Sequence, residues 1–223
     1  MAERLPLPLI ASETHGFIYV TFTVQKNRGP IFRNTQRRRA YAKHLLGAAA
    51  ELKNRADVES VRVLRAHLVP PLPGVPRHDF ALLIRTPDFD DLGSLRDSEQ
   101  YAQLGGTECL VGNNAAKIGD TEATLRGTFL LNHFTAPSSA NAVDVWKGLT
   151  DWYTSTIGVD NSTALTPANS ASPYELINYV RLNSPPPVFL LSQLLRPSFH
   201  RLVRGALKRH DMRALPAFYR VLG

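Results

Sequence analysis

Cysteine and long apolar runs are both scarce in this sequence of 223 residues. The only cysteine is Cys109, which excludes an internal disulfide framework and a cysteine-rich zinc site and favours a reducing compartment. The longest apolar candidate, residues 188–195, falls well short of the roughly 18 residues that a membrane-spanning helix needs. The first residues contain an acid and two prolines, which is not typical of a secretory signal. We therefore expect a soluble, cytoplasmic protein.

Several short catalytic motifs are also absent. The sequence contains no glycine-rich nucleotide loop, no HExxH zinc motif, no GxSxG nucleophile elbow and no paired CxxC. These absences argue against nucleotide hydrolysis, zinc catalysis and serine hydrolysis, and we predict no metal site. The composition, with 43% apolar and 20% charged residues, is typical of a globular protein.

The net charge of +7 is concentrated in two segments. Residues 26–55 carry nine Lys or Arg against one Glu, and residues 196–223 carry seven against one Asp. Such segments can meet nucleic acid, a phosphorylated substrate or an acidic membrane surface, but no specific nucleic-acid motif accompanies them, so solvated helix faces are the simpler interpretation. Three arginines at residues 37–39 do not fit the interpretation as a solvated helix face. They fall in the first turn of a predicted helix, where the macrodipole disfavours cations.

Two consecutive parts of the chain show the same order of predicted elements. Apolar residues alternate in predicted strands and recur every three or four residues in predicted helices. The first part, residues 1–118, is predicted as β-α-β-β-α-β over residues 17–24, 35–55, 58–69, 78–86, 88–104 and 107–118. The second part, residues 119–223, repeats this order over residues 129–136, 138–153, 159–166, 174–182, 188–209 and 216–222. We therefore expect an α+β protein made of two fused ferredoxin-like repeats.

This element order resembles the dimeric α+β barrel superfamily in its single-chain form. The resemblance covers residues 15–222 and depends on the paired segments FIYVTFTV with FLLNHFTA and HDFALLIRT with YELINYVRL. It implies a pseudodimer within one chain, whose two sheets close into one barrel, with a pocket between a sheet and its helices or inside the barrel. The superfamily includes cofactor-independent monooxygenases, lactone isomerases, polyketide cyclases and haem enzymes such as chlorite dismutases. Fold analogy does not choose among them.

Strand alternation predicts which side chains face the barrel interior. In the first strand Tyr19 and Thr21 lie opposite the fully apolar face, and alignment of the second copy brings His133 to the same side. The neighbouring Asn132 falls on the helix-facing side, as does Asn178 of a nearby strand. A hydrogen bond between these two amides is the ordinary explanation for them.

The third strands of the two copies carry a duplicated charge pattern. Asp79 and Arg85 of the first copy align with Glu175 and Arg181 of the second, and Tyr179 shares their face. An acid and an arginine therefore recur six residues apart on the face away from the apolar one. Ion pairs at the strand ends are the structural alternative to a functional role.

These residues suggest acid/base chemistry in the second copy. We expect His133 to move a proton, Glu175 to orient it, Tyr179 to donate to a developing oxyanion and Arg181 to fix an anionic group. The alternative for His133 is a hydrogen-bonded core residue. The corresponding residues of the first copy are expected to bind substrate: Tyr19, Thr21, Asp79 and Arg85.

Three functions follow as hypotheses. The first is a small-molecule enzyme that performs cofactor-independent oxygenation, cyclisation or isomerisation of a largely apolar or aromatic substrate. The second is a haem enzyme of the same superfamily, with His200 as the axial ligand, because the resemblance implies a ligand from the last helical stretch. The third is a non-catalytic protein whose residues 188–209 lie on a membrane surface or a partner. Oligomerisation beyond the pseudodimer is left open.

Overall fold

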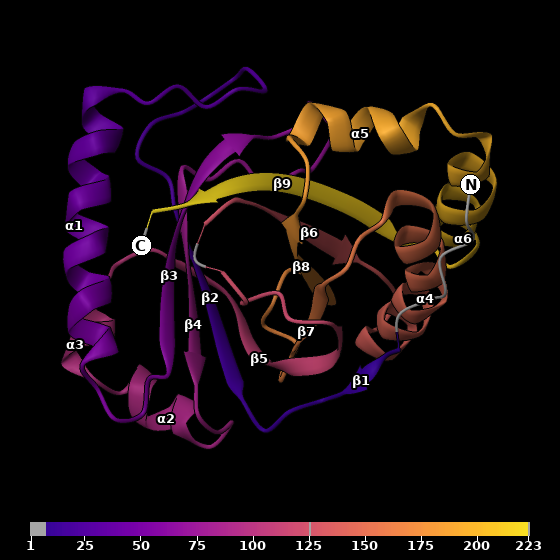
Figure 1. Cartoon of the computed structure of the whole chain (residues 1–223). Coiled ribbons are helices and arrows are strands. Elements are labelled where there is room, and N and C mark those ends of the chain that lie inside the picture. Colours follow the sequence, from indigo (N-terminus) through magenta and orange to yellow (C-terminus); the bar gives the residue numbers. More distant parts are fainter. Residues whose placement is uncertain (1–7, 125, 223) are drawn as a thin grey trace.

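The computed structural model describes residues 8–124 and 126–222 and has an α+β architecture (Figure 1). In the first half a two-residue strand, β1, precedes the predicted β-α-β-β-α-β order, with a pair of short helices at the second helical position. The elements are β1 (Ile10–Ala11), β2 (Gly16–Phe22), α1 (Gln36–Lys53), β3 (Ser60–Leu68), β4 (Phe80–Thr86), α2 (Asp91–Arg96), α3 (Glu99–Ala102) and β5 (Thr107–Ile118).

The second half has the same order with a longer helical region. Its elements are β6 (Thr128–Thr135), α4 (Ser139–Trp152), η1 (Tyr153–Ile157), β7 (Ser162–Pro167), β8 (Leu176–Leu182), α5 (Pro186–Leu194), η2 (Phe199–Arg204), α6 (Gly205–Arg209) and β9 (Arg213–Val221). The π-helical segments η1 and η2 are wider than α-helix, a local geometry found often at functional sites. The helical stretch expected over residues 188–209 is interrupted between α5 and η2, where Pro197 lies.

Eight of the nine strands in the described part of the chain form a closed antiparallel barrel. The order is β5-β2-β4-β3 in the first half and β9-β6-β8-β7 in the second, and the halves join through β3–β9 and β5–β7. The second strand of each half therefore pairs with the last strand of the other, and β1 adds only a short edge to β5. The predicted fold class is confirmed, whereas the division into two ferredoxin-like repeats, residues 1–118 and 119–223, stays a prediction.

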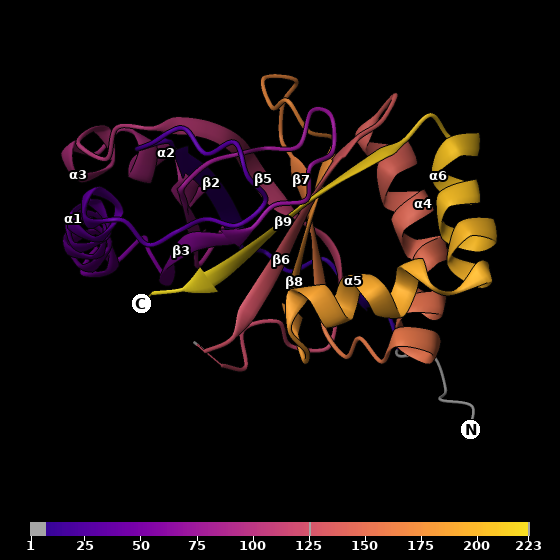
Figure 2. The ribbon, with the colours of Figure 1, turned by 90° about the horizontal axis from the view of Figure 1, so that it is seen from above.

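The helices cover the barrel on two opposite sides, as Figure 2 shows with α1–α3 on one side and α4–α6 on the other. In β2, Ile18, Val20 and Phe22 pack toward the first group of helices, while Tyr19 belongs to the cluster inside the barrel. The period of two in the strand sequence thus produces three apolar layers: the barrel interior and one helix-covered layer on each side. Within residues 8–124 and 126–222, no helix is both long and apolar enough to cross a bilayer.

The start of α1 explains one of the three unusual arginines, Arg38. The Thr35 hydroxyl caps the helix by accepting from the Arg38 backbone N–H at 3.3 Å. The Arg38 side chain is buried and forms an ion pair with Asp79, which lies just before β4. A buried carboxylate therefore balances the Arg38 cation at this helix start.

Candidate functional site

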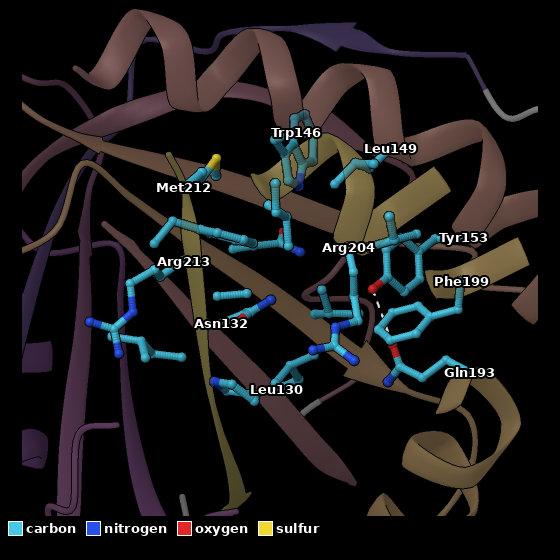
Figure 3. Close-up of a pocket in the computed structure, with 18 of the residues that line it drawn as sticks. Leu130, Asn132, Trp146, Leu149, Tyr153, Gln193, Phe199, Arg204, Met212 and Arg213 are labelled. Carbon is cyan, nitrogen blue, oxygen red and sulfur yellow. Dashed lines mark hydrogen bonds between the residues drawn. The ribbon is translucent and has the colours of Figure 1, made fainter. Parts of the chain in front are cut away.

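A large pocket lies in the second half, between the outer face of the sheet and its helices. Strands β6, β8 and β9 form its floor, and α4, η1, α5 and η2 form its walls (Figure 3). Its volume is about 1030 Å³, which is enough for a ligand of several fused rings. Apolar side chains dominate the lining, among them Leu130, Phe134, Trp146, Leu149, Phe189, Phe199 and Phe218.

Asn132 is a polar residue at the floor of this pocket, next to Asn178. Alternation along β6 turns its side chain toward the helices, where Figure 3 shows it between the floor and the walls. Asn178 is its cross-strand partner, yet the Asn178 Oδ1 accepts from the Ser162 hydroxyl at 2.5 Å. The Asn132 Oδ1 is buried and has no hydrogen-bond partner, so the expected bond between the two amides is not formed to this atom. A buried acceptor without a partner is costly unless something else donates to it.

A second polar pair lies in the pocket wall. The Tyr153 hydroxyl, at the start of η1, donates to the Gln193 Oε1 of α5 at 3.1 Å. Burial raises the pKa of Tyr153 well above its usual value, so the phenol stays protonated at neutral pH. Trp152 packs edge-on against the Tyr153 ring and donates from its indole to Ser198 at 3.1 Å. These contacts hold α4 and η1 against α5 and η2, and so fix the width of the pocket.

The mouth of the pocket is cationic. The exposed residues of the lining include Arg204, Lys208 and Arg213, together with Leu194 and His200. Among the lining residues that the structure describes, Asp211 is the single carboxylate. The mouth therefore attracts an anionic or readily ionised ligand.

His200 lies at this mouth, but its contacts do not suit a haem ligand. Its Nε2 donates to the Leu194 carbonyl oxygen at 2.8 Å, so the lone pair is on Nδ1, which lies 3.3 Å from the Arg204 guanidinium. An axial imidazole donates its N–H to a carbonyl and offers the other nitrogen to the metal. Here a guanidinium occupies the metal's place, so the side chain as it lies does not fit iron. The described residues also contain no cluster of three His, Cys, Asp or Glu side chains able to hold a metal ion.

The predicted base, His133, faces the barrel interior, on the opposite side of β6 from the pocket. It is fully buried, with Nδ1 3.1 Å from the Leu215 carbonyl oxygen and Nε2 3.1 Å from the Tyr19 hydroxyl. The carbonyl can only accept, so Nδ1 carries the proton and Nε2 accepts from Tyr19. Burial lowers the pKa of His133 to about 3, so the ring is neutral at physiological pH.

Other predicted residues of the barrel interior join this network. The Tyr19 hydroxyl lies 3.4 Å from that of Tyr219, and burial is the main cause that raises the pKa of Tyr19. The Thr21 hydroxyl donates to the Thr107 carbonyl oxygen at 3.3 Å and also contacts the Cys109 sulfur. His133, Tyr19 and Thr21 thus share the interior as expected, within a packed apolar cluster.

The two predicted acids have structural contacts. The Asp79 carboxylate accepts from the backbone N–H groups of Val24 at 2.6 Å and Gln25 at 2.7 Å, besides its ion pair with Arg38. The Glu175 carboxylate accepts from the Ser139 hydroxyl at 2.6 Å. The structure therefore does not pair Asp79 with Arg85, and it does not bring Glu175 to His133, because each carboxylate is used at a helix start.

The two arginines and Tyr179 lie toward one end of the barrel. Arg85 forms ion pairs with Glu59 at 2.6 Å and Glu122 at 2.9 Å, and the latter also pairs with Arg62. The Tyr179 hydroxyl, the Arg85 Nε and the Arg181 Nε are buried without a hydrogen-bond partner. Burial raises the pKa of Tyr179, and the nearby arginines oppose this. Of all the site residues predicted from sequence, only His200 lines the large pocket, and the catalytic roles of the others stay predictions.

The pocket groups that the sequence did not indicate are Tyr153, Gln193 and Arg204. Their helices meet only in the folded chain, so no spacing reveals them. The signal that could have been used is Asn132, a polar residue on the otherwise apolar helix-facing side of β6.

Comparison with known proteins supports the fold. No family model matches the sequence, and no curated protein matches it. An anthrone oxidase-like protein is similar in structure, with TM-score 0.63 and 12% identity over 97% of this chain and 95% of that chain. A candidate monooxygenase from Fusobacterium nucleatum has TM-score 0.57 and 8% identity over 94% of this chain and 93% of its own. A mutant chlorite dismutase from Candidatus Nitrospira defluvii has TM-score 0.52 and 11% identity over 94% and 92%.

Proposed function

We propose that this chain, a single-chain dimeric α+β barrel, oxidises a flat and largely apolar aromatic molecule with dioxygen in the second-half pocket, without a tightly bound cofactor. The observation that carries the proposal is an apolar pocket of about 1030 Å³ with the unpartnered Asn132 Oδ1 at its floor. Pockets of this kind use a few polar groups to orient an otherwise apolar ligand. The likeness to anthrone oxidase-like and monooxygenase structures supports an oxygenase at the level of the fold.

The proposed substrate is a phenol or an enolisable ketone with an activated CH₂ group. Loss of a proton gives a carbanion that transfers electrons to O₂. The overall change is R₂CH₂ + O₂ → R₂C=O + H₂O: two C–H bonds break, one oxygen atom forms the new carbonyl, and the other leaves as water. The four electrons that reduce O₂ all come from the substrate carbon.

The pocket residues have distinct roles in this proposal. The Asn132 amide N–H donates to the oxygen on which enolate charge develops. Trp146 and Phe199 line the pocket (Figure 3), and in this proposal their rings pack against the aromatic rings of the substrate. Arg204 at the mouth favours the ionised substrate, so a substrate of low pKa needs no strong base from the protein.

In this proposal His133 positions the site and does not transfer a proton. Its hydrogen bond to the Leu215 carbonyl oxygen ties β6 to β9 beneath the pocket, and Leu215 itself is part of the lining. The neutral, buried ring has no route to a substrate held on the other face of the sheet. If His133 were instead a catalytic base, its replacement would lower turnover without lowering stability. That result would distinguish the catalytic role from the positioning role.

The first test measures O₂ uptake with anthrone as the probe substrate. We expect O₂ consumption equal to anthrone loss, and one ¹⁸O atom from labelled O₂ in the product ketone. Asn132→Ala should lower kcat/KM by about a hundredfold, the usual effect of removing one oxyanion donor. Asn54→Ala, an exposed position at the end of α1, is the matched control and should leave the rate unchanged.

Other outcomes choose among the alternatives. Conversion of the probe without O₂ uptake would replace oxygenation by isomerisation or cyclisation. Activity that depends on added haemin, with a Soret band that is lost in His200→Ala, would replace the cofactor-independent proposal by the haem enzyme. Full activity of Asn132→Ala would remove this pocket as the site.

A further inference from the structure

Helix α5 is apolar on both of its faces. On the inner face Phe189 packs against Phe218, with ring centroids 6.3 Å apart. On the outer face Val188, Leu191 and Leu195 follow one another at helical spacing and are 54%, 54% and 77% exposed. A helix that is apolar all round normally has partners on every side, so the outer face lacks an occupant. Figure 1 shows α5 on the outside of the molecule.

The surface that continues from α5 is basic. Residues 176–210 contain no Asp or Glu. In η2 and α6 the exposed residues are His200 and Leu202 together with four cations, Arg201, Arg204, Lys208 and Arg209. We call this surface, formed by Val188, Leu191, Leu194, Leu195, Leu202 and these four cations, the α5–α6 face. Leucines next to lysines and arginines are the side chains with which peripheral proteins hold anionic bilayers.

We propose that the α5–α6 face docks on an anionic lipid bilayer, with the leucines inserted at the level of the headgroups and the cations against lipid phosphates. Helix α5 does not have to leave the sheet for this, because its leucines are already exposed while Phe189 stays packed. A second copy of the chain fits less well, because a twofold interface would place the same cations opposite one another.

The face also adjoins the mouth of the pocket. Leu194, Arg204 and Lys208 are exposed on the face and line the pocket as well. Docking would therefore open the pocket toward the bilayer, where apolar aromatic molecules accumulate. The docking proposal depends only on the surface residues. Delivery of a substrate from the membrane depends in addition on the proposed function.

Vesicle co-sedimentation of the full chain tests the docking independently of turnover. We use vesicles of phosphatidylcholine alone and of equimolar phosphatidylcholine and phosphatidylglycerol. The protein should bind the anionic vesicles and detach as salt is raised, because added ions screen the phosphates. Leu191→Glu/Leu195→Glu should lower the partition coefficient by about a hundredfold, since each leucine inserted in the bilayer contributes on the order of tenfold.

Two further variants and one hydrodynamic measurement complete the test. Arg201→Gln/Arg209→Gln should weaken binding and reduce its salt dependence. Ile31→Glu is the matched control, because Ile31 is an equally exposed apolar residue of the first half, and it should bind like the wild type. The proposal is overturned if the wild-type protein does not bind anionic vesicles. It is also overturned if Leu191→Glu/Leu195→Glu binds them as well as the wild type does. Light scattering that shows a dimer broken by Leu191→Glu/Leu195→Glu also overturns it, in favour of a second copy.

Discussion

Asn132 and His133 are neighbours on β6 and have opposite environments. His133 lies in the packed barrel interior with both ring nitrogens hydrogen-bonded, whereas Asn132 lies at the floor of a large pocket with an unpartnered oxygen. One residue along the strand therefore changes the environment completely. The His133 ring has a hydrogen-bond partner for each nitrogen, whereas the Asn132 amide still has an acceptor without a partner. That difference is why the proposed chemistry is assigned to the amide and not to the imidazole.

The buried neutral His133 should make stability depend on pH. Its pKa is about 3 in the folded chain and about 6.5 when unfolded, so the unfolded state binds the extra proton between these values. Stability is then fully present above pH 6.5 and falls as the pH is lowered, by about 1.4 kcal/mol per pH unit from this residue. From pH 7 to pH 5, the free energy of unfolding measured with urea should fall by about 2 kcal/mol more for the wild type than for His133→Gln. Parallel losses in the two proteins would show that His133 is already protonated or exposed.

Alternation in the sequence was sufficient to place His133, Tyr19 and Thr21 in the barrel interior. It could not reveal which face of the sheet contains a cavity, because cavity volume depends on how far α4 and α5 stand from the strands. Nor could it identify the partners of Asp79 and Glu175. Asp79 meets Arg38 across 41 positions of the chain, and only the folded arrangement brings them together.

At the scale of elements, a buried ion pair fastens α1 to the sheet. The Arg38 and Asp79 side chains are 3% and 0% exposed, and the Asp79 carboxylate also holds the chain after β2 through two backbone N–H groups. A buried ion pair of this kind contributes less to the free energy of folding than its contacts suggest, because burying both charges has a desolvation cost. Loss of one partner is nevertheless destabilising, because the other charge is then buried without a counterion. The helix start therefore depends on both residues.

Asp79→Ala should lower the free energy of unfolding by about 3–5 kcal/mol, because it leaves the Arg38 guanidinium buried without a counterion. The double change Arg38→Met/Asp79→Ala should cost less than the single change, because no charge is left behind. Urea titrations of the three proteins measure this. Neither residue lines the pocket, so the folded fraction of each variant should keep its kcat. A double variant less stable than Asp79→Ala would mean that the pair acts through its packing.

The sequence predicted the strands better than the helices that form the pocket. Strands β2 to β9 lie within a few residues of the expected segments, because half-buried strands show a clear period of two. The last helical stretch is in fact three pieces, and α4 passes into a π-helical turn. These departures from α-helical spacing belong to the pocket walls, where packing around a cavity overrides local preference.

At the scale of the whole molecule, the barrel depends on a close approach at the β5–β7 seam. Gly112 of β5 pairs with Pro167 of β7, and a Cβ at this position would overlap the carbonyl oxygen of the preceding residue, Thr166. Only glycine lets the two backbones approach so closely. This seam is one of the two strand pairings that join the halves of the described chain.

Gly112→Ala should therefore open the β5–β7 seam and lower the melting temperature by several degrees, since about 1 kcal/mol shifts a domain of this size by about 2–4 °C. Hydrogen exchange should show faster exchange of the β7 amides than of those in β2. Gly47→Ala is the control, because a Cβ in the middle of α1 meets open space and should stabilise the helix by about 0.5–1 kcal/mol. Unchanged protection of β7 in Gly112→Ala would mean that the seam can relax around a methyl group.

The place of β9 in the barrel sets the order in which the protein can form. Strand β9 lies between β3 and β6 and is the link through which the first half joins the second on that side. A growing chain on the ribosome therefore has β3 and β6 without their shared neighbour until residues 213–221 have emerged. Barrel closure must then wait for these residues, and until it occurs both strands expose edges to which other chains can pair. We expect folding to be slow and to finish late, because the contacts that close the barrel join residues far apart in the sequence. We also expect the chain to need chaperones that shield these edges during synthesis.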